Sequence, residues 1–210
     1  MLPFITADHF RLLLDGTGKP FAEFMDRVLR ATAAKLGVTP AQVHTNLRVN
    51  LADGGVDTQI DQGNDPEGHL AGPTVWQFKG RRFADVTEAD VREEILGASK
   101  QYARDLIIKG YAYRLCICED ADARAKQSLQ QKLNEFVTQV NPSAPAAIIL
   151  LPSDIAAWAN RYPSVVARYL GVPVEKFRWH DSWRPSALGE TQVFVPTEHY
   201  AEWAARAEAY

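Results

Sequence analysis

The sequence contains few of the residues that cross-link small domains or bind structural metals. Cys116 and Cys118 are its only cysteines, and its histidines are scattered without metal-ligand spacing. The two cysteines lie two residues apart on one face of an apolar segment, where neighbouring thiols cannot easily form a disulfide. Two thiols alone also cannot complete a structural zinc site. We therefore expect both to be buried as small hydrophobic residues.

Long apolar runs and a strong net charge are also missing. No segment has the uncharged apolar length of a membrane helix, and residues 1–14 lack a basic leader followed by an apolar stretch. We therefore expect a cytoplasmic protein without a membrane partner. The formal net charge of -3 neither indicates nor excludes a nucleic-acid partner, because such a partner depends on local charge. The 210 residues, 46% of them hydrophobic, suffice for one globular domain with a substantial core.

Two short segments carry the most informative pattern, Gly54-Gly55-Val56-Asp57 and Trp76-Gln77-Phe78-Lys79. In both segments and the residues beside them, apolar and polar side chains alternate with period two. This alternation predicts two half-buried strands, each with one apolar and one polar face. If the strands pair as a hairpin across the loop at residues 62–73, Asp57 lies opposite the stretch from Gln77 to Lys79.

Such a pairing brings a carboxylate, an amide oxygen and an ammonium group together. Mg²⁺ prefers oxygen ligands, and a nearby lysine can orient water or offset developing negative charge. The combination suits hydrolysis of phosphodiester bonds by metal-activated water. A structural alternative is a tight turn at Gly54-Gly55 closed by Asp57, with Gln77 and Lys79 on a solvated strand face.

Gly-Gly-x-Asp on one strand followed by Gln-x-Lys on the next resembles the PD-(D/E)XK nuclease superfamily, in its Mrr-like branch, over about residues 20–151. The resemblance implies a restriction-endonuclease-like α/β fold, with a central mixed β-sheet flanked by helices. It also implies that Asp57 and Gln77 bind the metal and that Lys79 positions the attacking water. The expected activity is that of a Mg²⁺-dependent endonuclease hydrolysing double-stranded DNA, with Mn²⁺ as a substitute metal.

Gln77 is the point at which the pattern departs from a pair of acids. An amide keeps an oxygen ligand but gives up a negative charge, so the metal affinity should be lower. A catalytically decayed nuclease fold that acts as a nucleic-acid-binding or oligomerisation module therefore stays open as an alternative. An RNA-directed nuclease is a further alternative, because the motif concerns the phosphodiester and says nothing about the sugar.

Residues 20–36 are predicted to form a helix, because apolar residues recur at helical spacing and Gly37 follows. Many members of the superfamily add an acid from the first helix. By that resemblance Glu23 is expected to complete the metal site, with Asp26 as the other candidate. Acidic residues near a helix N-terminus are also favoured by the helix dipole alone.

Basic residues follow the second segment. Arg81 and Arg82 follow Lys79 at the end of the second motif strand, and we expect them to contact DNA phosphates. Further basic residues along the next predicted helix are interspersed with acids, including Glu93 and Glu94, so a solvated helix face explains them better. Lys100 and Gln101 could point into the site, but long polar side chains beside an apolar stripe often extend to solvent. They stay outside the catalytic set.

The remaining core alternates between helical and strand patterns. One helix is expected from Thr87, with a capping box to Asp90, as far as Gly110. A strand at residues 111–118, a helix at 122–140 and a strand at 146–151 follow. The order of helix, three strands, helix, strand, helix, strand predicts an α/β sheet whose last strands are parallel and covered by helices.

Residues 152–210 are expected to form a helical and aromatic extension of the same single domain, residues 1–210. Two short helices broken at Pro163, an aromatic segment at 177–183 and a helix from Thr197 are predicted. Together with the resemblance, this architecture suggests the N-terminal effector domain of a bacterial antiphage defence protein, followed by an NTPase or sensor domain. Cutting both DNA strands would favour a symmetric homo-oligomer.

Overall fold

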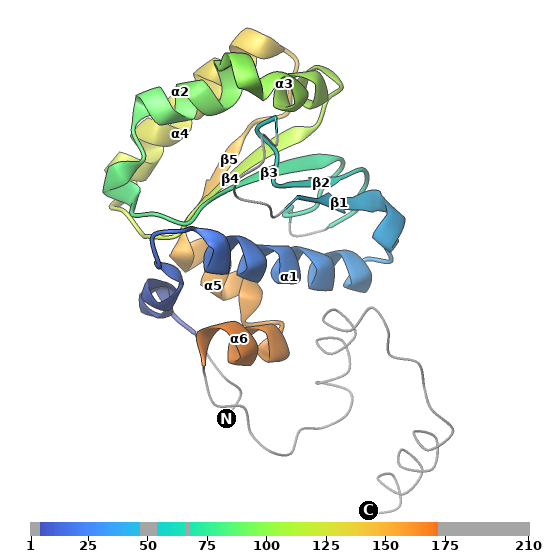
Figure 1. Ribbon diagram of the computed structural model, residues 1–210. Coiled ribbons are helices and arrows are strands. Elements are labelled where there is room, and N and C mark those ends of the chain that lie inside the picture. The colour runs from blue at the N-terminus through green and yellow to red at the C-terminus, as the bar shows by residue number, and fades with distance from the viewer. Residues whose placement is uncertain (1–4, 47–53, 66–67, 172–210) are drawn as a thin grey trace, which may run out of the picture.

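The computed structural model describes residues 5–46, 54–65 and 68–171 (Figure 1). These residues form a five-stranded mixed β-sheet with helices on both faces. The strands are β1 (Val43–Thr45), β2 (Thr58–Ile60), β3 (Thr74–Lys79), β4 (Ala112–Ile117) and β5 (Ile148–Leu150). The α-helices are α1 (Lys19–Lys35), α2 (Glu88–Leu96), α3 (Gln101–Ile108), α4 (Ala123–Val140), α5 (Pro152–Ala159) and α6 (Pro163–Leu170). Short 3₁₀ helices are η1 (Ala7–Leu13), η2 (Pro40–Gln42), η3 (Phe83–Asp85) and η4 (Ala98–Lys100).

The strands lie in the sheet in the order β1-β2-β3-β4-β5. The first three strands pair antiparallel, and β4 and β5 continue the sheet parallel to β3. Thr58 lies opposite Trp76, which confirms the predicted pairing of the two motif strands. The parallel pairing of β4 with β5 was also predicted. The α/β class, with a mixed sheet between helices, is therefore confirmed.

Each face of the sheet has its own hydrophobic core. Helices α1, α5 and α6 cover one face, and helices α2, α3 and α4 cover the other (Figure 1). The large buried side chains of the first core include Phe21, Phe24, Trp76, Phe78 and Trp158. Those of the second core include Val75, Ile95, Leu115, Leu133 and Ile149. Burial of both faces is what parallel strands with crossover helices require.

The motif strands are therefore buried on both faces, and the prediction that they are half-buried is wrong. All of β2 is buried, and so is β3 except for its last residue. Trp76 and Phe78 pack in the α1 core, whereas Val75 packs in the other. Because side chains alternate along a strand, Gln77 and Lys79 lie on the Val75 face, which α2, α3 and α4 cover. The polar face of the hairpin is thus enclosed by helices.

The single helix predicted from Thr87 to Gly110 is also wrong, because the helix breaks at Gly97. This residue has extended backbone angles, with φ -59° and ψ 146°. Its carbonyl accepts the N–H of Lys100 at 3.0 Å and a hydrogen bond from the guanidinium of Arg104. The apolar stripe continues through the break, so periodicity alone could not reveal it. The break separates α2 from α3.

The capping box predicted at the start of α2 is confirmed. The N–H of Thr87 donates to Oδ2 of Asp90 at 2.9 Å, and the N–H of Asp90 donates to the hydroxyl of Thr87 at 3.2 Å. Hydrogen bonds from the Thr87 hydroxyl and N–H, with Arg81 nearby, lower the pKa of Asp90 from 3.8 to about 2. The ionised carboxylate therefore stabilises the start of this helix.

We expect Asp90→Asn to remove an acid-sensitive part of the stability. Because the folded pKa of Asp90 lies below 3.8, its stabilising effect is complete above that pH and is lost as the pH falls towards about 2. The difference in unfolding free energy between wild type and Asp90→Asn should shrink over this range in urea titrations. Glu93→Gln, on the exposed face of α2, is the control. A difference that stays constant with pH would contradict this role.

Two amide side chains of α4 close the outer edge of β5. Gln130 donates from Nε2 to the carbonyl of Ala147 at 2.7 Å and accepts the N–H of Ile149 at 2.7 Å. Asn134 accepts the N–H of Ala147 at 2.9 Å. Backbone groups that an edge strand would otherwise expose are therefore satisfied within the chain.

Cys116 and Cys118 are free and buried, as predicted. Burial raises the pKa of both thiols, that of Cys118 to about 12. Both thiols therefore stay protonated near neutral pH, which suits packing and not nucleophilic chemistry.

The start of the extension agrees with the prediction of two short helices, because α5 and α6 are separated just before Pro163. The predicted aromatic segment at 177–183 and the helix from Thr197 lie outside the described residues. Across the described ranges, the helices lack the combination of length and apolar character that crossing a membrane needs.

Candidate active site

Asp57 lies where β2 and β3 begin to separate. Its N–H donates to the carbonyl of Trp76 at 2.9 Å, which departs by one residue from the register of the two strands. Its carboxylate oxygen Oδ2 accepts the backbone N–H of Phe78 at 2.6 Å. Phe78 stands between Gln77 and Lys79, so the structure brings Asp57 beside both of the residues predicted to act with it.

Gln77 is buried with one unsatisfied acceptor. The residue is 5% exposed, and its side-chain oxygen Oε1 has no hydrogen-bond partner among the described residues. A buried acceptor without a partner costs about 1–3 kcal/mol, and a cation or a hydrogen-bond donor placed beside it would recover that cost. Within the described ranges, no group of three or more His, Cys, Asp or Glu residues could hold a metal. A cation at this place would therefore depend on the carboxylate of Asp57 and this amide oxygen.

The ammonium group of Lys79 is held by Glu94 on α2. The two side chains form an ion pair, and the second carboxylate oxygen of Glu94 lies 3.1 Å from the ammonium nitrogen of Lys100. None of the three side chains is more than 18% exposed. Charges this far from solvent interact more strongly than surface pairs, and removing one leaves the others uncompensated. One carboxylate therefore fixes two lysines beside the motif strands.

The prediction that Glu94 lies on a solvated helix face is wrong, because its side chain is only 12% exposed. It lies three residues after Val91 and directly before Ile95, both of which are buried, so it belongs to the inward stripe of α2. An acid within an apolar stripe needs a cation as partner, and that signal was available in the sequence. Lys100 joins the site through this pairing, whereas Gln101 is exposed and hydrogen-bonds within α3.

Gly54 and Gly55 pack closely against α3 and the residue before it. Both have positive φ, 65° and 89°, and the carbonyl of Gly54 accepts the N–H of Ala103 at 3.0 Å. A Cβ at Gly54 would lie 2.6 Å from the Cβ of Tyr102, and one at Gly55 would lie 2.9 Å from Cδ of Lys100. The two glycines therefore make the tight turn and also let α3 approach the segment that carries Asp57.

Gly54→Ala is expected to lower the unfolding free energy by about 3 kcal/mol, because it adds a clash to the strain of a positive φ. Gly72→Ala is the matched control. Gly72 has φ 81° but nothing within 4 Å of an added Cβ, so only the strain of about 1 kcal/mol remains. Chemical denaturation of both variants measures the difference. Equal losses would contradict the close approach of α3.

Glu23 lies on α1, which covers the sheet face opposite to the one that carries Gln77 and Lys79 (Figure 1). Its side chain is 40% exposed and its carboxylate is 3.7 Å from the ammonium group of Lys19. Among the described residues, Asp57 contacts the segment from Gln77 to Lys79 through the N–H of Phe78, whereas the contact of Glu23 is with Lys19.

Asp26 has a structural role in the described contacts. It is 5% exposed, pairs with Arg30 at 2.9 Å and accepts the hydroxyl of Thr45 at 2.9 Å. These bonds satisfy the buried carboxylate and connect α1 to β1. The burial of Asp26 is therefore explained without a metal.

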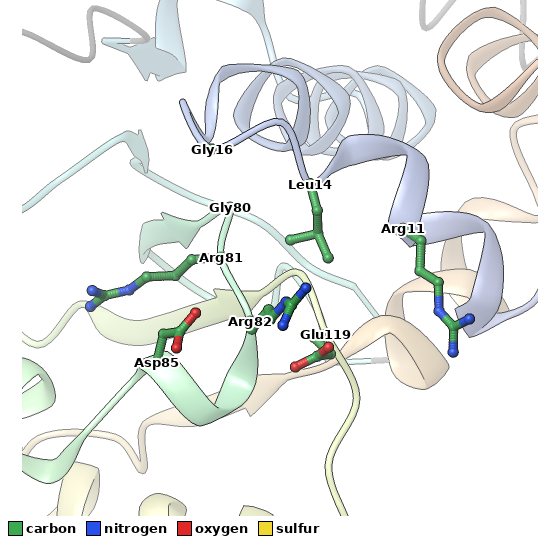
Figure 2. A pocket seen from close by; sticks show the side chains of 8 residues that line it. All are labelled: Arg11, Leu14, Gly16, Gly80, Arg81, Arg82, Asp85 and Glu119. Atoms are coloured by element: carbon green, nitrogen blue, oxygen red, sulfur yellow. The ribbon is translucent and has the colours of Figure 1, made fainter.

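Arg81 and Arg82 follow Gly80 after the end of β3 and line a pocket of about 590 Å³ (Figure 2). Arg81 pairs with Asp90 at 3.1 Å, and the side chain of Arg81 is 39% exposed. Arg82 is exposed. Their place two and three residues after Lys79 leaves them near any phosphate that reaches this lysine.

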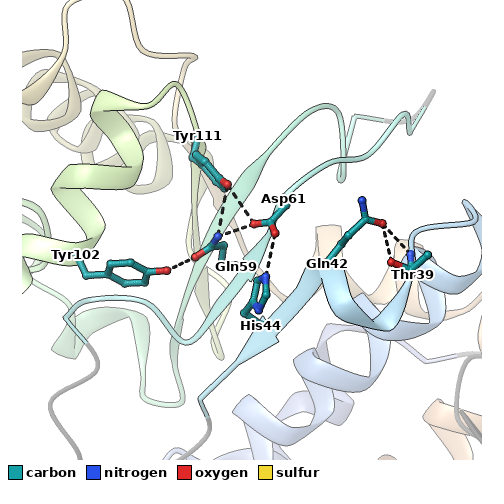
Figure 3. A network of polar contacts seen from close by, with 7 residues as sticks. All are labelled: Thr39, Gln42, His44, Gln59, Asp61, Tyr102 and Tyr111. Atoms are coloured by element: carbon teal, nitrogen blue, oxygen red, sulfur yellow. Dashed lines mark hydrogen bonds and ion pairs between the residues drawn. The ribbon is translucent and has the colours of Figure 1, made fainter.

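The polar face of β2 continues into a network around Gln59 and Asp61, which the sequence pattern did not reveal (Figure 3). Asp61 accepts the hydroxyl of Tyr111 at 3.1 Å and lies 2.9 Å from Nε2 of His44. Gln59 connects Asp61 to the hydroxyl of Tyr102. Burial opposes ionisation of Asp61, but hydrogen bonds from Gln59, His44 and Tyr111 outweigh it and lower the pKa of Asp61. The network therefore anchors Tyr102 across the polar face of β2.

No protein-family model, curated protein or solved structure matches this chain. A functional interpretation therefore depends on the chemistry of the site itself, which combines Asp57, Gln77, Lys79, Glu94 and Lys100.

Proposed function

We propose that the protein is a metal-dependent endonuclease that hydrolyses phosphodiester bonds of double-stranded DNA. The observation that carries the proposal is the buried, unpartnered oxygen of Gln77 next to the strand position at which Asp57 binds the N–H of Phe78. Lys79 follows two residues later on the same face of β3. A carboxylate, an amide oxygen and an ammonium group are thus held at one end of the motif hairpin.

The donor set fits a hard divalent cation. Asp57 and Gln77 would hold it, and both offer the oxygen ligands that Mg²⁺ and Mn²⁺ take. Bound there, the cation would lower the pKa of a water molecule and polarise the phosphate. With one negative charge in this pair, affinity should be modest. Glu23, the third ligand that the resemblance implies, pairs with Lys19 on the α1 side of the sheet and is not part of this donor set.

The side chains around the proposed metal have separate roles. The N–H of Phe78 fixes the orientation of the Asp57 carboxylate. An ammonium group has three N–H donors, and Lys79 directs one to Glu94. Its others can bind a phosphate oxygen and the attacking water, so that the positive charge offsets charge that develops at phosphorus. Glu94 is a positioning residue in this scheme.

The arrangement of the elements supports the resemblance to the PD-(D/E)XK superfamily, including a restriction-endonuclease-like fold. A helix precedes an antiparallel pair that carries the two motifs, and a parallel strand follows through a helical crossover. We extend the proposal to an effector domain of bacterial antiphage defence that acts as a homo-oligomer beside an NTPase or sensor domain. Fold-level analogy alone supports this extension.

A second candidate is a catalytically decayed nuclease fold that binds nucleic acid or assembles. The specific observation in its favour is that Lys79 is already paired with Glu94, beside a strand whose second motif position is an amide. This candidate predicts DNA binding or assembly that needs no metal and survives Asp57→Asn.

Incubation of the purified protein with supercoiled plasmid tests the proposal. We expect nicked and linear DNA with Mg²⁺ or Mn²⁺, and no cleavage once a chelator removes the metal. A parallel reaction with double-stranded RNA of the same sequence separates the RNA-directed alternative. The nuclease proposal would be contradicted if the protein bound DNA but did not cleave it with either metal, even at protein concentrations that permit assembly. That result would support the second candidate.

A further inference from the structure

The pocket beside Arg81 and Arg82 lies beyond the carboxyl ends of the parallel strands β3 and β4 (Figure 2). Gly80 and the two arginines follow β3, and Glu119 follows β4. Arg11 and Leu14, at η1, form the opposite side. The carboxyl ends of parallel strands are where α/β sheets commonly bind ligands.

The walls of this pocket are held together by contacts within the chain. A Cβ on Gly80 would lie 2.4 Å from the Cα of Gly18, so the loops after η1 and β3 touch through their backbones. The thiol of Cys118 donates to the carbonyl of Phe10 at 3.5 Å, which connects η1 to the end of β4. The pocket is therefore a formed feature of the fold.

Three arginines and two acids, Asp85 and Glu119, line this pocket, so guanidinium groups outnumber carboxylates. Arg82 has no carboxylate within ion-pair distance among the described residues. Arg11 lies 3.5 Å from Asp8, and both side chains are 81% exposed, so that pair contributes little. Arg81 is directed away from Arg82 and Arg11 (Figure 2) and pairs with Asp90 at 3.1 Å, so it is not counted among the free donors. Glu119 uses one oxygen to accept a backbone N–H at 3.0 Å.

These groups match a phosphate attached to a larger polar molecule. Arginine binds phosphate through paired, charge-assisted hydrogen bonds, and a phosphate monoester carries more charge than a diester. A lone phosphate would fill only part of about 590 Å³, which is the size of a small-molecule site. We propose that the pocket binds a nucleoside phosphate monoester, with Arg82 and Arg11 on the phosphate and Glu119 accepting from the nucleoside.

The monoester could be a free nucleotide or the phosphorylated end of a DNA strand. Arg82 follows Lys79 by three residues, so a DNA strand end held at Arg82 would lead the following phosphodiesters towards Lys79 and Asp57. This strand-end version rests on the proposed nuclease function, whereas binding of the monoester does not.

Fluorescence polarisation in the presence of a chelator tests the pocket without any cleavage. The probes are one labelled DNA duplex with a 5′-phosphate, a 3′-phosphate or neither. We expect one phosphorylated end to bind about tenfold more tightly than the unphosphorylated duplex. Arg82→Ala should abolish this preference. Arg124→Ala removes an equal charge from the exposed surface of α4 and should keep it.

Adenosine monophosphate as competitor identifies the source of the monoester. If adenosine monophosphate displaces the phosphorylated duplex, the pocket binds free nucleotides. If the phosphorylated duplex binds more tightly but adenosine monophosphate does not displace it, the pocket binds the phosphorylated ends of DNA strands. Equal affinity for all three duplexes together with no binding of the nucleotide would overturn the proposal. The proposal would also be overturned if Arg82→Ala and Arg124→Ala changed the preference for the phosphorylated duplex to the same extent. If the plasmid is not cleaved, the proposed nuclease site at Asp57 is contradicted, but the results of these binding experiments do not change.

Discussion

Replacing Asp57 with asparagine is expected to lower the rate of DNA cleavage by about a thousandfold in a protein that stays folded. Asparagine retains an oxygen that can accept the N–H of Phe78, now at 2.6 Å, but removes the negative charge that a cation requires. Plasmid cleavage in Mg²⁺ measures the rate, and thermal unfolding checks the fold.

Glu135→Gln is the matched control for this experiment. It removes one negative charge from a surface pair on α4, where the Glu135 carboxylate lies 3.0 Å from Lys132, and should leave the cleavage rate within about twofold. DNA affinity in chelator should be alike in both variants. Cleavage by Asp57→Asn at the wild-type rate would exclude Asp57 from the active site.

Glu94→Gln is expected to lower the unfolding free energy by about 3 kcal/mol. The change keeps the shape of the side chain but leaves Lys79 and Lys100, at most 18% exposed, without their shared counterion. Urea unfolding measures the loss. Cleavage should fall as well, because Lys79 is no longer held in place.

Glu93→Gln, at the neighbouring residue, is the control that distinguishes the loss of a buried charge from the loss of an exposed one. Glu93 is exposed on the same helix, so its loss should cost less than about 0.5 kcal/mol. Adding Lys79→Met to Glu94→Gln should recover part of the stability by removing a charge that Glu94 no longer balances. Equal effects of the two glutamate substitutions would show that the lysine cluster does not depend on Glu94.

The features that the sequence predicted correctly are those set by local or short-range patterns. The helix that carries Glu23, the capping box at Thr87 and the pairing of the two motif strands all follow from periodicity, capping chemistry and loop length. The approach of Asp57 to the Gln77 and Lys79 segment followed from that pairing, so this core of the candidate site was predictable.

What the sequence did not predict depends on which helix covers which face. Period-two alternation separates the two faces of β3 but does not assign α1 to one and α2 to the other. The place of Glu23 away from Gln77, and the pairing of Glu94 with Lys79, therefore needed three-dimensional structure. The break at Gly97 was hidden for a related reason, because the apolar stripe runs through it.

The amide side chains of Gln130 and Asn134, which extend from α4 to the edge of β5, limit how copies of this chain can assemble. Strand addition joins two molecules by extending a sheet through its open edge. Here α4 already supplies the hydrogen bonds that an incoming strand would make at Ala147 and Ile149. If the proposed nuclease acts as a symmetric pair, the two copies would therefore have to bring their active sites together through a surface other than the edge of β5.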